Sequence, residues 1–299
     1  MRYLLCLFKA RFAKRLRLKP WIKRESAMTP IVVDTDTNTA NDNISAQLLG
    51  LTDQHIHYFY QTHEQNQTTP VNSTKTGIHH LMFDDFQALV KSAAIAGIEI
   101  KIASGFRSFE RQLLIWNNKF TGKSVINNIK GEQVDITQLS DDKVIEAIML
   151  YSALPGASRH HWGCDIDIYA ANLLNEQSLQ LEPWEYESSG PMAKLSTWLS
   201  DNAAEFGFYF PYDKFRGGIA AEPWHLSYAP LAEQYQSSFS LGLLKQCLSN
   251  NDIAGKSVIL ENLPTIAKRF ILNINSNHLK IKKVNHCNIS AKPRGETYE

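Results

Sequence analysis

Hydrophobic residues recur most regularly between positions 80 and 116 of the 299-residue chain. Over residues 80–96 they follow helical spacing, and Gly97 comes directly after them, which predicts a helix that ends at this glycine. Over residues 98–102 three isoleucines alternate with charged residues, a pattern typical of a strand with one buried face. A second helix is expected over residues 108–116.

A second alternating pattern covers residues 164–169. The even positions, a cysteine and two isoleucines, fall on one face of the expected strand, and the odd positions fall on the other. Asp165 and Asp167 therefore share the face that points away from the apolar side. Two carboxylates on one strand face are candidates for chemistry rather than for the core.

The rest of the pattern predicts mostly helices. Pro264 is expected at the first position of a helix, where its missing N–H is tolerated, and Ser140 with Asp141 is expected to cap another helix. Polar composition predicts loops over 61–76 and 118–137. The other expected elements are helices over 44–49, 140–151, 192–206, 241–248 and 264–272, and a strand over 208–210. These elements predict an α+β fold with a small, mainly antiparallel sheet and flanking helices.

Composition limits the class of protein. Hydrophobic residues make up 43% of the chain, and no apolar run reaches the about 18 residues of a transmembrane segment. Residues 1–25 carry nine Lys and Arg and one acid, which leaves 22 basic and 29 acidic residues elsewhere. A body with this net negative charge argues against nucleic acid as the main partner. The four cysteines are scattered, which argues against a zinc ribbon and a dense disulfide framework.

The N-terminus lacks the order of a conventional export signal. Its apolar stretch, residues 3–8, precedes the basic residues and is too short for a signal peptide. We therefore expect a cytoplasmic protein. Residues 1–27 are interpreted as a basic, disordered leader with Met28 as the true start, and binding of this segment to an anionic membrane surface is the alternative.

The strongest chemical signal is a set of two histidines and an aspartate. His160 and Asp167 fit a turn at Gly163 between a loop and a strand, and His225 can supply a third ligand from a distant segment. Three ligands of this kind leave a fourth position open, which is typical of catalytic zinc. The neighbouring His161 is an alternative to His160, although its spacing to Gly163 fits less well.

Glu222 is the candidate general base for such a site, because a carboxylate beside the metal can take a proton from water and pass it on. Glu222 and His225 are three residues apart, which on an ideal strand places them on opposite faces. We expect Pro223 to introduce a kink or bulge that lets both side chains face one metal.

Arg107 follows the strand over 98–102 on a glycine-containing turn. Its guanidinium can bind a substrate carboxylate through two hydrogen bonds or stabilise a developing negative charge on a carbonyl oxygen. Ser158 is a candidate substrate contact or a residue that orients the loop. Gln112 is expected to support Arg107 in substrate binding.

These residues lie in three ordered motifs: Ser-Gly-Phe-Arg-Ser-Phe-x-x-Gln, Ser-x-His-x-x-Gly-x-x-x-Asp and Glu-x-Trp-His. Their order resembles the VanY-type D-alanyl-D-alanine carboxypeptidases, zinc peptidases of bacterial peptidoglycan whose fold is shared with the Hedgehog signalling domain. The resemblance covers residues 77–230 and implies a zinc cleft in that fold. It implies Zn2+ as the cofactor, His160, Asp167 and His225 as ligands, Glu222 as the base, and Arg107 and Ser158 as substrate contacts.

Asp165 departs from the resemblance, because many VanY-type members have a small residue there. Since it shares the strand face of Asp167, we expect it to support a metal ligand from behind. The departure leaves the substrate more open than the metal site.

The resemblance also divides the chain. We expect a leader over 1–27, an N-terminal extension over 28–76, a catalytic domain over 77–230, a helical extension over 231–275 and a polar tail over 276–299. The expected activity is release of C-terminal D-alanine from a peptidoglycan-derived peptide. The expected cytoplasmic location favours L,D-cleavage of recycled tetrapeptides over D,D-cleavage. An endopeptidase that cuts cross-links, or a non-catalytic zinc domain that binds peptidoglycan, is the alternative.

Overall fold

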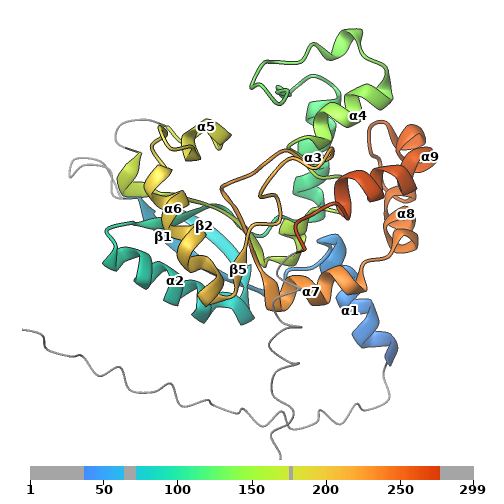
Figure 1. Ribbon diagram of the computed structural model, residues 1–299. Coiled ribbons are helices and arrows are strands. Elements are labelled where there is room, and N and C mark those ends of the chain that lie inside the picture. The colour runs from blue at the N-terminus through green and yellow to red at the C-terminus, as the bar shows by residue number, and fades with distance from the viewer. Residues whose placement is uncertain (1–36, 64–71, 175–177, 277–299) are drawn as a thin grey trace, which may run out of the picture. The chain divides into compact units, whose positions relative to one another are not determined.

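The computed structural model describes residues 37–63, 72–174 and 178–276 (Figure 1). From Asn38 onward the described residues form one compact unit. The expected leader, and all but the first residue of the expected tail, lie outside the described residues. None of the helices in the described ranges is both long enough and apolar enough to cross a membrane.

A four-stranded antiparallel sheet carries the centre of the fold. The strand order is β3-β4-β6-β5, with bounds of Ile100–Ser104, Asp165–Ala170, His225–Tyr228 and Phe208–Tyr209 respectively. All six residues of β4 are buried, because apolar side chains cover one face and polar partners cover the other. The alternation over residues 164–169 therefore predicts this strand and its two faces. β3 begins two residues later than expected.

A separate two-stranded antiparallel sheet precedes β3. β1 covers Ile56–His63 and β2 covers Asn72–His79, so the expected loop over 61–76 is wrong at both of its described ends. The sequence pattern hides these strands because polar residues dominate β2. Buried Gln61 shows how so polar a sheet docks: its side chain donates to the carbonyl of Ile102 at 3.0 Å and accepts from the amide of Ile102 at 2.8 Å.

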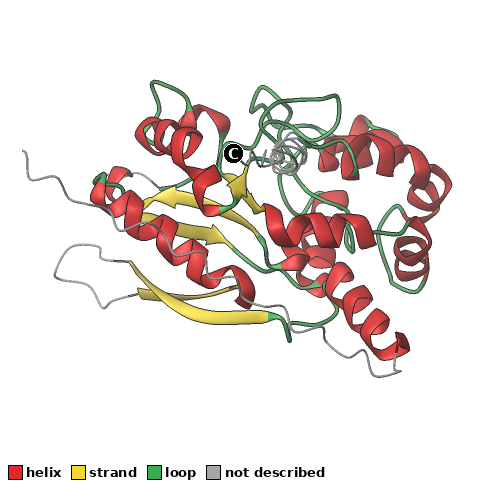
Figure 2. Ribbon diagram, turned by 60° about the horizontal axis from the view of Figure 1, so that its bottom comes forward, coloured by secondary structure: helices red, strands yellow, loops and turns green. Residues whose placement is uncertain are grey.

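Nine α-helices accompany the sheets in the described part of the chain. Their bounds are Thr37–Leu49 (α1), Phe83–Ile95 (α2), Phe109–Phe120 (α3), Asp141–Met149 (α4), Pro183–Tyr186 (α5), Ala193–Asn202 (α6), Ala229–Ser238 (α7), Leu241–Ser249 (α8) and Lys256–Ile266 (α9). Helices α2, α6 and α7 pack with the four-stranded sheet in one hydrophobic cluster, and α3, α4, α8 and α9 form a second. Figure 2 shows the strands gathered on one side of these elements and a group of helices on the other.

The parts expected as extensions contribute to the same two clusters as the expected catalytic domain. Leu48 and Leu49 of α1 enter one cluster each, and Leu244 and Leu248 of α8 pack in the second. The second cluster also holds Phe109, which follows directly on the segment that carries Arg107. The C-terminal helices therefore stabilise the helix that positions part of the site.

The expected position of Pro264 is wrong. This proline lies inside α9 rather than at the first position of a helix. Ile259, Leu263 and Ile266 form a buried stripe along α9, so packing outweighs the loss of one backbone N–H. A π-helical turn over Ala267–Ile271 then completes the segment.

The expected cap position at Ser140 is confirmed, although its side chain makes no capping hydrogen bond. Ser140 occupies the N-cap position of α4, but its hydroxyl donates to the carboxylate of Asp142 instead of accepting from a backbone N–H. Other expected helices differ mainly in length. The helix expected over 192–206 is α6 followed by a 3₁₀ turn, and α3 extends into the loop expected over 118–137.

Candidate active site

A short 3₁₀ helix over Arg159–Trp162 places His160 directly before β4. Gly163 ends this helix with a φ of 68°, in the left-handed region that favours glycine. A Cβ atom at this position would lie 2.3 Å from a side-chain carbon of Ile56. The chain therefore needs glycine here both for the turn and for the close approach of β1.

His160, Asp167 and His225 converge on one point. Asp167 on β4 pairs directly with His225 on β6, which makes them cross-strand neighbours. Nε2 of His160 lies 3.4 Å from Oδ2 of Asp167, and Nδ1 of His225 lies 3.3 Å from Oδ1 of Asp167. The three candidate ligand atoms all lie within 4.8 Å of one another.

The outer nitrogen of each histidine is held by an acceptor. Nδ1 of His160 lies 3.0 Å from the carbonyl oxygen of Gly105, and Nε2 of His225 lies 3.0 Å from Oδ1 of Asp165. These contacts assign the protons to the outer nitrogens, so that each inner nitrogen presents a lone pair to the centre. Both histidines are therefore oriented as metal ligands would be.

The donor set fits a zinc ion. Oδ1 of Asp167 and Nδ1 of His225 are buried and lack a hydrogen-bond partner, which is costly unless another group satisfies them. Tetrahedral zinc with ligands at 2.0–2.1 Å separates neighbouring ligand atoms by about 3.3 Å. The distances of Asp167 to the two histidines agree with this separation. Burial would raise the pKa of Asp167, but His160 and His225 outweigh it and lower that pKa well below its usual value.

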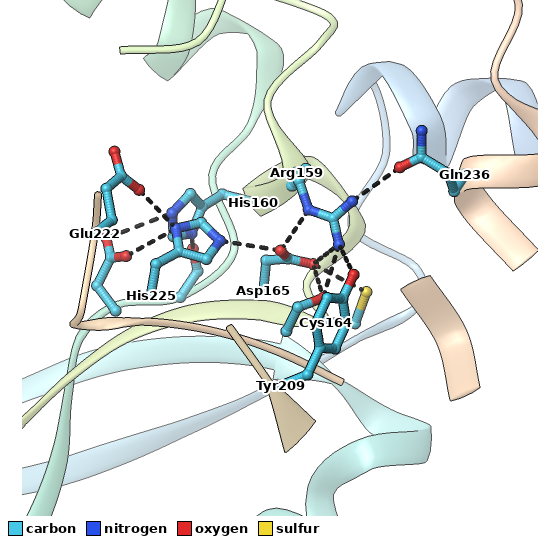
Figure 3. A network of polar contacts seen from close by, with 11 residues as sticks. Arg159, His160, Cys164, Asp165, Tyr209, Glu222, His225 and Gln236 are labelled. Carbon is cyan, nitrogen blue, oxygen red and sulfur yellow. Dashed lines mark hydrogen bonds and ion pairs between the residues drawn. The ribbon is translucent and has the colours of Figure 1, made fainter. Parts of the chain in front are cut away.

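Behind His225 lies a buried network centred on Arg159 (Figure 3). Nε of Arg159 lies 2.7 Å from Oδ1 of Asp165, and its Nη2 donates to Ser227 at 2.7 Å and to Tyr209 at 3.0 Å. Burial would lower the pKa of Arg159, but Asp165 raises it above its ordinary value. Asp165 therefore stays charged beside His225.

Glu222 reaches the same point from a turn before β6. The amide of His225 donates to the carbonyl of Glu222 at 3.1 Å, and the Glu222 carboxylate lies 3.2 Å from Nδ1 of His225. The expected kink at Pro223 is thus a tight turn that precedes the strand, not a bulge within it. Burial raises the pKa of the Glu222 carboxyl. A buried carboxyl with a raised pKa suits a group that takes up and releases a proton.

Arg107 lies on the wall of the pocket that contains the metal-ligand candidates. Its guanidinium donates to Gln112 and to Ser104, each at 2.9 Å. Burial lowers the pKa of Arg107, and Asp167 and Glu222 oppose that shift. Gln112 is fully buried and is not part of the pocket wall, so it reaches a substrate only through Arg107.

Ser158 lines the pocket, and its side chain does not cap the following 3₁₀ helix. His161 does not compete with His160 for a metal. Its Nε2 accepts from the amide of Gly156 at 3.1 Å, and its Nδ1 lies 2.6 Å from the carbonyl oxygen of Arg107. Burial lowers the pKa of His161 to about 3, so this neutral ring fixes the backbone of the Arg107 turn.

The family model for VanY, described as D-alanyl-D-alanine carboxypeptidase, matches residues 75–231. The chain belongs to this family. It is also 40% identical over 122 residues to an uncharacterized protein of Haemophilus influenzae, a match that covers 40% of this chain and 93% of that protein.

Two solved structures are similar to this chain. A mutant of the vancomycin-resistance D,D-pentapeptidase VanY in complex with Zn(II) is 22% identical, with a TM-score of 0.38, and the match covers 62% of this chain and 87% of that chain. The LD-carboxypeptidase LdcB is 24% identical, with a TM-score of 0.40, and the match covers 62% and 73%. Both TM-scores are below 0.5, so the identification depends on the family match.

Three residues of this VanY-family site were not expected from the sequence. Arg159 supports Asp165, whereas Lys119 and Tyr212 line the pocket. The spacing of Lys119 from Gln112 on α3, which is seven residues, is a signal that both share one helix face. Arg159 carries no such signal for its contacts to Tyr209, Ser227 and Gln236, because these residues lie far away in the sequence. Tyr212 lies outside the helices and strands, where no periodicity marks it.

Proposed function

We propose that this chain is a zinc-dependent carboxypeptidase that releases C-terminal D-alanine from peptidoglycan stem peptides. One observation carries the proposal: a metal-ligand triad, a buried carboxylate and a guanidinium face one pocket. Membership of the VanY family supports peptide hydrolysis as the reaction. A guanidinium in the pocket supports a substrate that ends in a free carboxylate.

His160, Asp167 and His225 would hold the zinc ion. When bound, the ion supplies Lewis acidity that activates water and polarises the scissile carbonyl group. The protein holds the ligands in place through Gly105 behind His160 and Asp165 behind His225. This arrangement fixes the direction of each lone pair before a metal binds.

Glu222 acts as the general base. Its carboxylate takes a proton from the water that attacks the carbonyl carbon of the scissile amide, and it delivers that proton to the nitrogen of the leaving D-alanine. The C–N bond then breaks, and the products are free D-alanine and a peptide shortened by one residue. Burial, which raises the pKa of Glu222, makes the protonated intermediate form of this side chain accessible.

Arg107 binds the C-terminal carboxylate of the substrate. Gln112 and Ser104 hold the guanidinium from one side, which leaves its other N–H groups for a ligand. Ser158 on the same pocket wall offers a hydroxyl to the peptide backbone. These contacts place the terminal residue, and hence its amide bond, beside the metal ligands.

Tetrapeptides are the proposed substrates, in keeping with the expected cytoplasmic location, and pentapeptides are the competing class. Incubation of the zinc-loaded full chain with a stem tetrapeptide and a stem pentapeptide, followed by mass spectrometry, distinguishes them. Loss of one D-alanine from the tetrapeptide supports L,D-cleavage, and loss from the pentapeptide alone contradicts it. If neither peptide loses D-alanine, the proposed carboxypeptidase activity is contradicted.

A further inference from the structure

Lys119 is a cation on the pocket wall besides Arg107 and the ion-paired Arg159, and the reaction proposed above does not use it. It lies on α3, and its side chain is partly buried. Its Nζ donates to the hydroxyl of Ser152 at 2.6 Å, and both residues line the pocket together with Arg107 and Glu222. An ammonium group in such a place is costly unless a ligand or a partner compensates it.

A chain of hydrogen bonds fixes the ammonium of Lys119 relative to the guanidinium of Arg107. Gln112 accepts from Arg107 at 2.9 Å and donates to the carbonyl of Ala153 at 2.6 Å. Ser152, the residue before Ala153, accepts from Lys119. The two cations therefore lie along one wall, connected through Gln112 and the Ser152–Ala153 segment.

The two cations are held by different hydrogen-bond partners. Gln112, which contacts Arg107, and Lys119 are seven residues apart on α3, a rise of about 10 Å between their backbone positions. Arg107 contacts the first of these residues, whereas the ammonium of Lys119 lies beside the Ser152 hydroxyl. Two positive groups with different anchors match two anionic groups on a ligand better than a single carboxylate.

The acidic side chains of the pocket have other partners, so that Lys119 can bind a ligand. Among the described residues, no ion pair involves Lys119 or Arg107. Asp167 and Glu222 are directed at the two histidines, and Glu182 accepts a hydrogen bond from Asn127. Burial, followed by the charge of Arg107, lowers the pKa of Lys119, whereas Glu222 opposes that shift and a bound anion would oppose it further.

We propose that Lys119 forms a second carboxylate subsite, and that it recognises a side-chain carboxylate on a substrate residue close to the C-terminus. Arg107 binds the terminal carboxylate and Lys119 binds the second one. The preferred stem peptide then carries a diacidic amino acid such as diaminopimelate, rather than lysine, at its third position. This subsite rests on the proposed function, because it assumes a peptide that ends in the Arg107 region.

Peptide binding to the zinc-loaded Glu222→Gln protein tests the subsite without turnover. Calorimetry compares two stem tetrapeptides that differ only in meso-diaminopimelate or lysine at the third position. We expect the diaminopimelate peptide to bind about tenfold more tightly, because only it can pair with Lys119. The added change Lys119→Gln should reduce this ratio to less than twofold, whereas Lys119→Arg should preserve most of it.

Lys123 provides the matched control, because it is an exposed lysine just after α3 and does not line the pocket. Lys123→Gln in the same background should keep the tenfold ratio. Equal weakening of both peptides by Lys119→Gln would overturn the subsite, since it would mean that Lys119 only supports the wall or shares the terminal carboxylate. Equal binding of the two peptides before any change at Lys119 would overturn it as well.

The binding experiment tests the subsite, and an activity assay tests the proposed function independently. Release of D-alanine is measured with the wild-type protein on the same two peptides. If no D-alanine is released but the protein still distinguishes the two peptides through Lys119, the carboxypeptidase activity is contradicted and the subsite is supported. Release of D-alanine without such discrimination keeps the carboxypeptidase and overturns the subsite.

Discussion

Oδ1 of Asp165 lies 3.0 Å from Nε2 of His225, on the side of the imidazole opposite to Asp167. A carboxylate in this position fixes the tautomer of a metal-binding histidine and increases its basicity. We expect Asp165→Asn to weaken zinc binding about 10- to 100-fold. Competition with a chromophoric chelator measures the affinity directly.

Ser227→Ala is the control for this change. Ser227 also donates to Asp165, at 3.0 Å, but it leaves the contact between Asp165 and His225 in place. Its zinc affinity should stay close to that of the wild type. Unchanged affinity in Asp165→Asn would mean that His225 does not depend on Asp165.

Arg159 is expected to matter for stability. It is buried and forms an ion pair with buried Asp165. Arg159→Met leaves that carboxylate without its main partner, which should cost about 3–5 kcal/mol in the free energy of unfolding. Urea unfolding of the metal-free protein measures the loss.

The double variant Arg159→Met/Asp165→Asn distinguishes a coupled pair from two independent residues. Because it removes both charges, its loss of stability should be smaller than the sum of the two single losses. Additive losses would contradict the coupling between Arg159 and Asp165.

Arg107 is expected to act through its planar guanidinium. Arg107→Lys keeps a positive charge but loses the two parallel hydrogen bonds to a carboxylate and the contacts to Gln112 and Ser104. We expect kcat/KM for D-alanine release to fall about 100-fold, with an increase in KM. Steady-state kinetics on the preferred stem peptide give this value, and a lysine variant with wild-type kinetics would remove Arg107 from substrate binding.

His79 is expected to make the fold sensitive to acid. Burial, then the neighbouring His55 and His80, lowers the pKa of His79 from 6.5 to about 3. The unfolded chain therefore binds more protons than the folded chain between these two pH values. The stabilisation is fully present above pH 6.5 and is lost as the pH falls toward 3, so the Tm should decrease over this range.

His79→Asn tests that contribution. Asparagine can keep the acceptor for the amide of Leu81, which Nδ1 of His79 provides at 3.1 Å, but it does not titrate. The decrease in Tm between pH 7 and pH 5 should become smaller than in the wild type. His57→Asn changes an exposed histidine and should leave the decrease as it was. An identical pH profile for His79→Asn and the wild type would contradict the assignment.

The sequence reveals the parts of the site that depend on local pattern. Gly163 predicts the turn after His160, and strand alternation predicts that Asp165 and Asp167 share a face, as they do on β4. The order of the three motifs indicates which distant segment supplies His225. The structure brings these residues together, while their roles in catalysis stay proposals.

The sequence pattern does not predict contacts between residues that are far apart in the chain. Arg159 contacts Gln236, 77 residues away, and only the folded chain brings the two together. The pattern does not predict β1 and β2, because polar residues dominate β2 and the side chain of Gln61 bonds to the backbone of Ile102 on β3. The prediction for Pro264 is wrong because tertiary packing tolerates a proline inside α9, whereas local rules place it at the start of a helix.

In the proposed mechanism, one metal held by His160, Asp167 and His225 works with Glu222 as the base. The most direct test measures zinc content and D-alanine release together in Glu222→Gln. We predict about one zinc per chain and a loss of about 10²–10⁴ in kcat, because only proton transfer is removed. His160→Ala, by comparison, should lose the zinc as well. Zinc-loaded Glu222→Gln with activity close to wild type would contradict the account.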